Sequence, residues 1–144
     1  MILKYYAVID TNVLVSAALK YKSVPGSIVR LAFDGLIIPV LNSDIEKEYR
    51  EVLSRSKFHL SADIVDEIIN TFHDKGMYIT PEGLDIDLPD PKDKVFYEVV
   101  MEKRKDDDAY LVTGNIKHFP IKPFVVTPRE MLDIILKDND ALTE

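Results

Sequence analysis

The chain has 144 residues, which is enough for one compact domain with a hydrophobic core. It contains no cysteine, no targeting pattern at its start and no apolar run near the ~20 residues that span a membrane, so we expect a soluble cytoplasmic protein without disulfide bonds or thiolate metal sites. The net charge of −7 argues against a protein that holds nucleic acid by basic patches alone, although bound divalent cations can offset an acidic site.

Five short apolar stretches have the length of buried β-strands. They are continuous apolar runs, a pattern typical of a parallel sheet that is covered by helices on both faces. The chain is therefore predicted to be an α/β protein. The predicted strands are residues 3–9, 36–41, 77–80, 109–113 and 124–127.

Helical segments alternate with these strands, and cap residues, prolines and glycines mark their ends. A polar loop is expected over residues 81–89, which carry three acids and two prolines. We expect one domain over residues 1–137, followed by a polar tail at 138–144. The predicted helices are residues 12–19, 25–34, 43–54, 61–74, 90–104 and 129–136.

Asp10 directly follows the first predicted strand. An unpaired charge at the end of a buried strand is costly, and the carboxyl ends of strands are also where ligands bind in open α/β sheets. The residue is therefore either the cap of the next helix or the first ligand of a site. Its position alone leaves both interpretations open.

Two further acids lie on or beside apolar helix faces. Glu48 flanks the apolar stripe of the helix at 43–54, where it is either a ligand or a boundary residue that reaches water. Asp93 lies at the centre of the apolar face of the helix at 90–104, but an acid in a first helical turn also stabilises the helix dipole.

Three carboxylates in one cleft repel each other and raise one another's pKa. Mg²⁺ or Mn²⁺ with oxygen ligands removes that cost. Polar residues at neighbouring element ends could orient the carboxylates or bound water, although turn and cap chemistry also explains them. These supporting residues are Thr11, Asn12, Ser43 and Asn115.

Five motifs, taken in order, resemble those of the PIN-domain nucleases. They are IDTNVLVS at 9–16, EYREVL at 48–53, DPKDKVF at 90–96, YLVTGN at 110–115 and VTPRE at 126–130. The resemblance implies a three-layer α/β/α fold with a central parallel sheet. It also implies metal-dependent cleavage of RNA, often by the toxin of a toxin–antitoxin pair, and hence an antitoxin partner and a homodimer.

The resemblance carries over to single residues. The acidic positions of the family motifs fall on Asp10, Glu48 and Asp93, which would bind Mg²⁺ or Mn²⁺. Thr113 lies in the fourth motif as a supporting residue. The fourth family position, usually an aspartate, is Asn115 here. An amide can bind a metal through its carbonyl or orient a water, but it brings no negative charge.

We therefore expect a Mg²⁺- or Mn²⁺-dependent ribonuclease, with Lys20, Lys22 and Lys117 as contacts to the RNA backbone. An alternative is a catalytically weak PIN-like module that acts mainly by binding a partner protein, which the acidic charge balance and Asn115 favour. A third interpretation is a metal-free α/β domain in which the three acids are helix caps.

Overall fold

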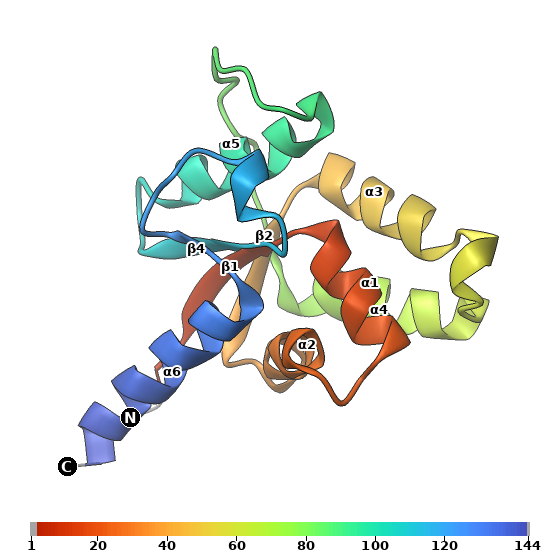
Figure 1. Cartoon of the computed structure of the whole chain (residues 1–144), viewed down its shortest axis with the longest axis horizontal. Helices are drawn as coiled ribbons and strands as arrows, with labels where there is room; N and C mark the ends of the chain where they lie inside the picture. The colour runs from red at the N-terminus through yellow and green to blue at the C-terminus, as the bar shows by residue number, and fades with distance from the viewer. Residues whose placement is uncertain (1–2, 144) are drawn as a thin grey trace.

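A computed structural model describes residues 3–143, with side chains up to residue 140. Over these residues, five parallel strands form one sheet in the order β3-β2-β1-β4-β5 (Figure 1). The predicted parallel α/β sheet is thus confirmed, with each strand slightly shorter than expected. The strands are β1 (Tyr5–Ile9), β2 (Ile37–Leu41), β3 (Met77–Tyr78), β4 (Ala109–Val112) and β5 (Val125–Val126).

Helices cover both faces of this sheet. α5 packs on one face, against β1, β2 and β4, while α2 and α6 lie on the opposite face (Figure 1). The predicted three-layer arrangement is therefore confirmed. The helices are α1 (Thr11–Leu19), α2 (Val24–Asp34), α3 (Ser43–Leu53), α4 (Ala62–Lys75), α5 (Lys94–Lys103) and α6 (Pro128–Thr143), and 3-10 turns occur at η1 (Ser56–Phe58), η2 (Pro91–Asp93) and η3 (Ile116–His118).

The central strand β1 pairs with β2 on one side and with β4 on the other, where Ile9 is in register with Val112. Along the chain, β2 and β3 follow on one side of β1, and β4 and β5 then lie on its other side. The strand order therefore reverses at β1 and β4. In open parallel sheets, ligands bind in the crevice at the carboxyl ends of such strands.

Aromatic packing fixes α3 against the end of β1. Tyr49 is 1% exposed, and its ring lies 6.0 Å from that of Phe72 and 6.4 Å from that of Phe96. Its hydroxyl donates a hydrogen bond to the carbonyl of Ile9, the last residue of β1. A buried tyrosine hydroxyl needs such a partner. The contact therefore sets the position of α3, and with it that of the neighbouring Glu48.

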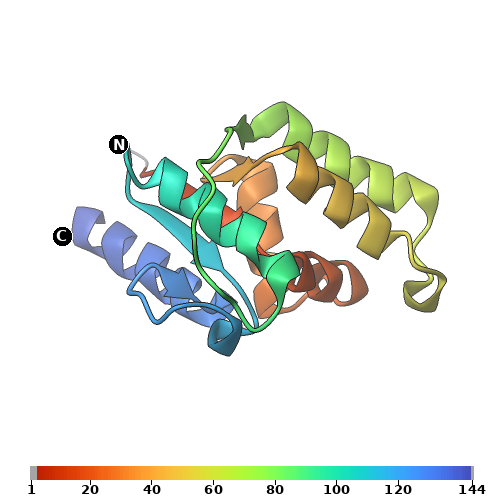
Figure 2. The same ribbon diagram turned by 90° about the horizontal axis from the view of Figure 1, so that it is seen from above.

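Helix ends follow the expected chemistry. Asn42 is the N-cap of α3, and its side chain accepts a hydrogen bond from the N–H of Ile45 at 2.9 Å. α2 ends at Gly35, whose φ of 87° is in the left-handed region that glycine adopts without a Cβ clash. The loop at 81–89 is confirmed and runs along α5 (Figure 2).

Two helix predictions were wrong at their ends. The last helix continues past residue 136 to Thr143, and the hydroxyl of Tyr5 donates to Asp138 at 3.0 Å, which ties the polar stretch to β1. The helix expected from residue 90 begins as the 3-10 turn η2, so Asp93 precedes α5 instead of lying inside its first turn. The division into a domain at 1–137 and a tail stays a prediction. Within the part described, none of the helices is both long and apolar enough to cross a membrane.

Candidate functional site

Asp10 lies where β1 ends and α1 begins, and its side chain is tied to the sheet. Its Oδ2 accepts hydrogen bonds from the hydroxyl of Thr113 at 2.7 Å and from the amide of Asn12 at 3.3 Å. Although Asp10 holds the N-cap position of α1, its carboxylate makes no capping hydrogen bond. Thr113 directly follows β4, so the register of β1 with β4 brings these two residues together. The backbone N–H groups of Thr11 and Asn12, at the start of α1, also lower the pKa of the Asp10 carboxyl group, so its contacts are compatible with both the capping and the ligand interpretation.

Burial makes the Asp10 carboxylate costly to ionise. Only 5% of the residue is exposed, and this burial raises its pKa from the ordinary 3.8 to about 6. The hydrogen bond from Thr113 lowers the pKa, while the negative charge of Asp93 raises it. Asp10 and Asp93 are thus close enough to repel each other, as expected for members of one site.

Glu48 projects from α3 towards α1. Its Oε2 accepts a hydrogen bond from the hydroxyl of Thr11, the first residue of α1. The side chain is half-buried, and burial raises its pKa; the hydrogen bond from Thr11 lowers it, and the charge of Asp10 raises it. Glu48 therefore points into the protein towards the end of β1, not out to water.

Asp93 reaches the same region from η2. Its side chain is 15% exposed, and Oδ2 lies 3.2 Å from Nδ1 of His118, which belongs to η3. Burial and the charge of Asp90 raise the pKa of Asp93, whereas His118 lowers it. Its carboxylate makes no capping hydrogen bond to α5, although it occupies the N-cap position.

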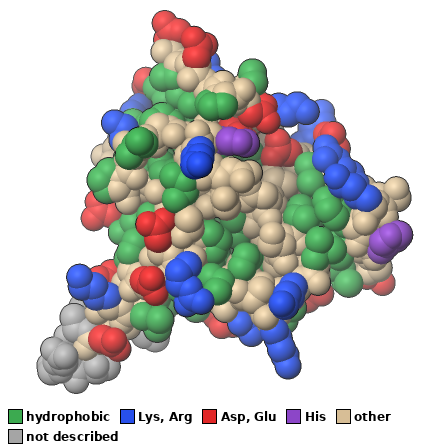
Figure 3. Space-filling model, viewed as in Figure 1, with side chains coloured by type: hydrophobic (Ala, Val, Ile, Leu, Met, Phe, Trp, Pro, Cys, Tyr) green, Lys and Arg blue, Asp and Glu red, His purple; other side chains and the backbone are tan. Residues whose placement is uncertain are grey.

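A groove of about 410 Å³, here called the acidic groove, joins these elements. It is lined from α1, α3, the η1 turn and η2, so residues far apart in the sequence share one surface. On the visible face of the molecule, acidic side chains gather at the tip of the loop that leads into α5, whereas basic side chains are spread over the face (Figure 3). The polar lining residues are Thr11, Asn12, Ser16, Glu48, Arg55, Asp90, Lys92 and Asp93, and the apolar ones are Val15, Val52 and Phe58.

The donor set suits a hard divalent cation. In each of the three acids, a side-chain donor binds one carboxylate oxygen. These oxygens are Oδ2 of Asp10, Oε2 of Glu48 and Oδ2 of Asp93. Hydrogen bonds of this kind commonly orient carboxylates that bind metals. Among the residues that the structure describes, however, no three His, Asp or Glu side chains come close enough to enclose an ion. The three acids share one site without closing around a single point.

Asn115 borders this site. It is exposed, and its backbone N–H donates to the hydroxyl of Thr113 at 2.9 Å. A neighbouring hollow is lined by Asn115, Gly114 and Asn12, and Asn12 accepts a hydrogen bond from the N–H of Gly114 at 3.2 Å. Asn12 lines both this hollow and the acidic groove, so it links Asn115 to the three acids.

The other expected residues lie farther out. Ser43 is exposed at the start of α3, more than one helical turn before Glu48. Lys20 and Lys22 follow the far end of α1, whose nine residues span about 13.5 Å, so they lie away from the carboxyl end of β1. Lys117 lies on η3 and lines a hollow with Asn115.

Sequence reasoning missed several residues of the site. Asp90 and Lys92 lie in the same motif as Asp93 and could have been found there. His118 follows Asn115 by three residues, but only its contact with Asp93 reveals its place in the site. The turn after α3 carried no signal of its own. The missed residues are Arg55, Phe58, Asp90, Lys92 and His118.

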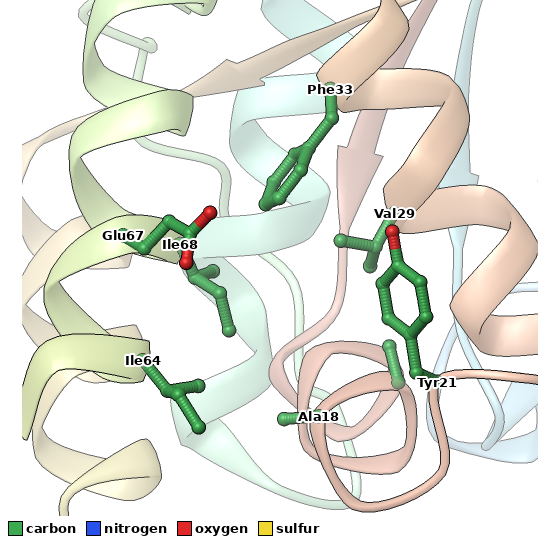
Figure 4. A pocket seen from close by; sticks show the side chains of 8 residues that line it. Ala18, Tyr21, Val29, Phe33, Ile64, Glu67 and Ile68 are labelled. Carbon is green, nitrogen blue, oxygen red and sulfur yellow. The ribbon is translucent and has the colours of Figure 1, made fainter. Parts of the chain in front are cut away.

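A second hollow of about 380 Å³, here called the apolar hollow, lies near the C-terminal end of α1. Val29 and Phe33 of α2 face Ile64 and Ile68 of α4 across it (Figure 4). Glu67 is the one charged residue of its lining within the described part of the chain. The two hollows thus differ in chemistry while sharing the same helix.

Comparison with known proteins agrees with the motifs. A family model described as PIN domain matches residues 6–117, a span that contains the three acids and Asn115. Neither the curated proteins nor the solved structures contain a significant match. Because the family model covers more than half of the sequence, the chain belongs to the PIN domain family, whose members are generally nucleases that use divalent metals.

Proposed function

We propose that the protein is a metal-dependent ribonuclease that cleaves phosphodiester bonds within RNA. The observation that supports this function best is the convergence of Asp10, Glu48 and Asp93 from three different elements at the carboxyl end of β1. Burial raises the pKa of each carboxyl group, and each has another of the three acids among the charges that raise its pKa further. Carboxylates arranged in this way are better suited to a cation than to a bare protein interior.

Mg²⁺ or Mn²⁺ would be held by Asp10, Glu48 and Asp93 and would activate a water and neutralise charge on the phosphate. The chain's own donors orient these ligands: Thr113 binds Asp10, and Thr11 binds Glu48. Because carboxylates bind metal when deprotonated, the pKa of about 6 at Asp10 makes metal binding release a proton at about pH 6 and below.

Asn115 would assist at the border of the site through its amide. The amide brings no charge, so the site carries three carboxylates, whereas the family motifs that it resembles usually have four. Asn115 and Asn12 line the same hollow, and Asn12 also lines the acidic groove. We propose that Asn115 orients water or substrate.

Cleavage of a labelled RNA tests this function. Wild type and Asp10→Asn are assayed with Mn²⁺ and with a chelator, and Asp63→Asn, an exposed aspartate on α4, serves as the matched control. We expect Mn²⁺-dependent cleavage that falls at least ~100-fold in Asp10→Asn, the range seen for loss of a key electrostatic group, and stays unchanged in Asp63→Asn. Absence of Mn²⁺ binding by calorimetry together with absence of cleavage of any RNA would overturn the proposal.

A second candidate is a catalytically weak module that acts by binding a partner, and Asn115 at the fourth motif position favours it. Mn²⁺ binding without RNA cleavage would support this candidate over the first. An antitoxin partner and a homodimer remain predictions of the family resemblance. Co-expression with a protein from an adjacent reading frame tests the former, and sedimentation velocity of the purified chain tests the latter.

A further inference from the structure

The turn after α3 presents a cation and an aromatic ring to the acidic groove. Arg55 and Phe58 both line the groove, and the turn between them is closed by a 3.1 Å hydrogen bond from the N–H of Phe58 to the carbonyl of Arg55. His59 follows with a φ of 54°, in the left-handed region that few non-glycine residues adopt. The turn is thus a defined structure that holds both side chains at the same groove.

Phe58 has no role in the core that would explain its position. Among the described residues, it belongs neither to the buried core nor to the partly buried hydrophobic residues packed against it. The ammonium of Lys57 lies 5.1 Å from its ring centroid. Proteins stack unpaired bases on partly exposed aromatic rings of this kind among charged groups, since every base has a π-face.

The groove also holds two cations beside its acids. Arg55 and Lys92 are exposed, and within residues 3–140 neither forms an ion pair with a carboxylate. They line the groove together with Glu48, Asp90 and Asp93. Carboxylates repel a nucleic-acid backbone, so a phosphate chain needs cations of this kind beside them to enter the groove.

We propose that the acidic groove binds single-stranded RNA, with one base stacked on Phe58 and the phosphates on either side of it bound by Arg55 and Lys92. This inference rests on the proposed ribonuclease function and assigns the residues of this chain that contact the RNA. In a duplex, each base is already stacked between its neighbours and paired, and its face is not free for Phe58. The lysines expected from the sequence, Lys20 and Lys22, have no part in this groove.

Fluorescence anisotropy of a short labelled RNA of mixed sequence, measured in EDTA, tests this binding without cleavage. Phe58→Ala should raise the Kd about 10- to 100-fold, whereas Phe58→Trp keeps a stacking surface and should bind as wild type does. Tyr21→Ala, which removes an exposed aromatic ring of the apolar hollow, is the matched control and should leave the Kd unchanged.

The cations are tested by salt dependence. Arg55→Gln and Lys92→Gln should each lower the slope of log Kd against log salt by about 0.7, the value for one phosphate contact on a single strand. Arg129→Gln makes the same charge change at an exposed site on α6 and should leave the slope unchanged. The same RNA annealed to its complement should bind more weakly than the single strand.

The outcomes separate this inference from the proposed function. If Mn²⁺-dependent cleavage occurs but the Kd of Phe58→Ala equals that of wild type, or the duplex binds as tightly as the single strand, the inference is overturned and the ribonuclease function stands. If the RNA binds with the expected dependence on Phe58 but is never cleaved, the ribonuclease function alone fails. In a cleaving enzyme, Phe58→Ala should raise KM and leave kcat unchanged.

Discussion

α1 joins two hollows of similar size and opposite chemistry. Its first turn borders the acidic groove, of about 410 Å³, and its last turn borders the apolar hollow, of about 380 Å³. In the groove, side chains are buried at a free-energy cost, because burial raises the pKa of Glu48 and Asp93, which line it. In the hollow, burial of apolar surface is favourable. The volume of a hollow therefore says nothing about its function. The free-energy cost of burying the side chains that line the hollow is informative.

The two regions also differ in what holds their side chains. Donors from distant parts of the chain orient the acids, such as Thr113 for Asp10. In the hollow, packing holds the side chains in place: the ring centroids of Phe33 and Phe72 lie 6.4 Å apart in an edge-on arrangement. We therefore expect changes in the groove to affect chemistry and pH dependence, and changes in the hollow to affect stability alone.

The largest expected effect is the pH dependence of the metal-free protein. The pKa of Asp10 is about 6 in the folded state and 3.8 as its ordinary value, so between these pH values the folded protein binds more protons than the unfolded chain. Its free energy of unfolding should therefore fall as the pH rises from about 4 to about 6, by about 3 kcal/mol from Asp10. Urea denaturation in EDTA measures this, and a rise over that range would contradict it.

Asp10→Asn should remove that dependence. The amide cannot ionise, so the variant should be more stable than wild type by about 1–3 kcal/mol at pH 8 in EDTA, while it loses cleavage activity. Saturating Mn²⁺ should stabilise the wild type and narrow this difference. If the variant were instead less stable in EDTA, the carboxylate of Asp10 would be a structural group and not a ligand.

Phe33→Ala should have the opposite profile. The loss of a partly buried ring against Phe72 should lower the free energy of unfolding by about 2 kcal/mol, since the site is partly open to water. Cleavage per folded molecule should match wild type, because Phe33 lines the apolar hollow and not the groove. A change in kcat at a temperature where the variant is fully folded would show that the two regions are coupled.

The smallest effect is expected at the rim of the hollow. Ile64 is 44% exposed, and Ile64→Gln keeps the α4 backbone that Ser61 caps. Its free energy of unfolding should stay within about 0.5 kcal/mol of wild type, as is usual for surface substitutions. Thermal denaturation of the two proteins side by side measures this, and a larger loss would mean that Ile64 contributes to the packing of α4.

The amino-acid sequence by itself determined the elements and the position of Asp10, because strand runs, helix caps and the residue after a strand are local features. Helical periodicity put Glu48 on the flank of an apolar stripe and left its role open, and it put Asp93 inside a helix that in the structure begins one residue later. Where local signals were polar and weak, it missed a helix end: α6 continues past the end predicted at residue 136, and Asp138 accepts a hydrogen bond from Tyr5.

Only the tertiary structure decided which groups meet. Thr113 binds Asp10 across 103 residues of sequence, and Thr11 binds Glu48 across 37. Periodicity gives the face of one element, but not the register and rotation of two elements against each other, which depend on packing such as that of Tyr49 against the end of β1. For the same reason, Phe58 became a candidate for base stacking only when the fold placed its turn beside the three acids.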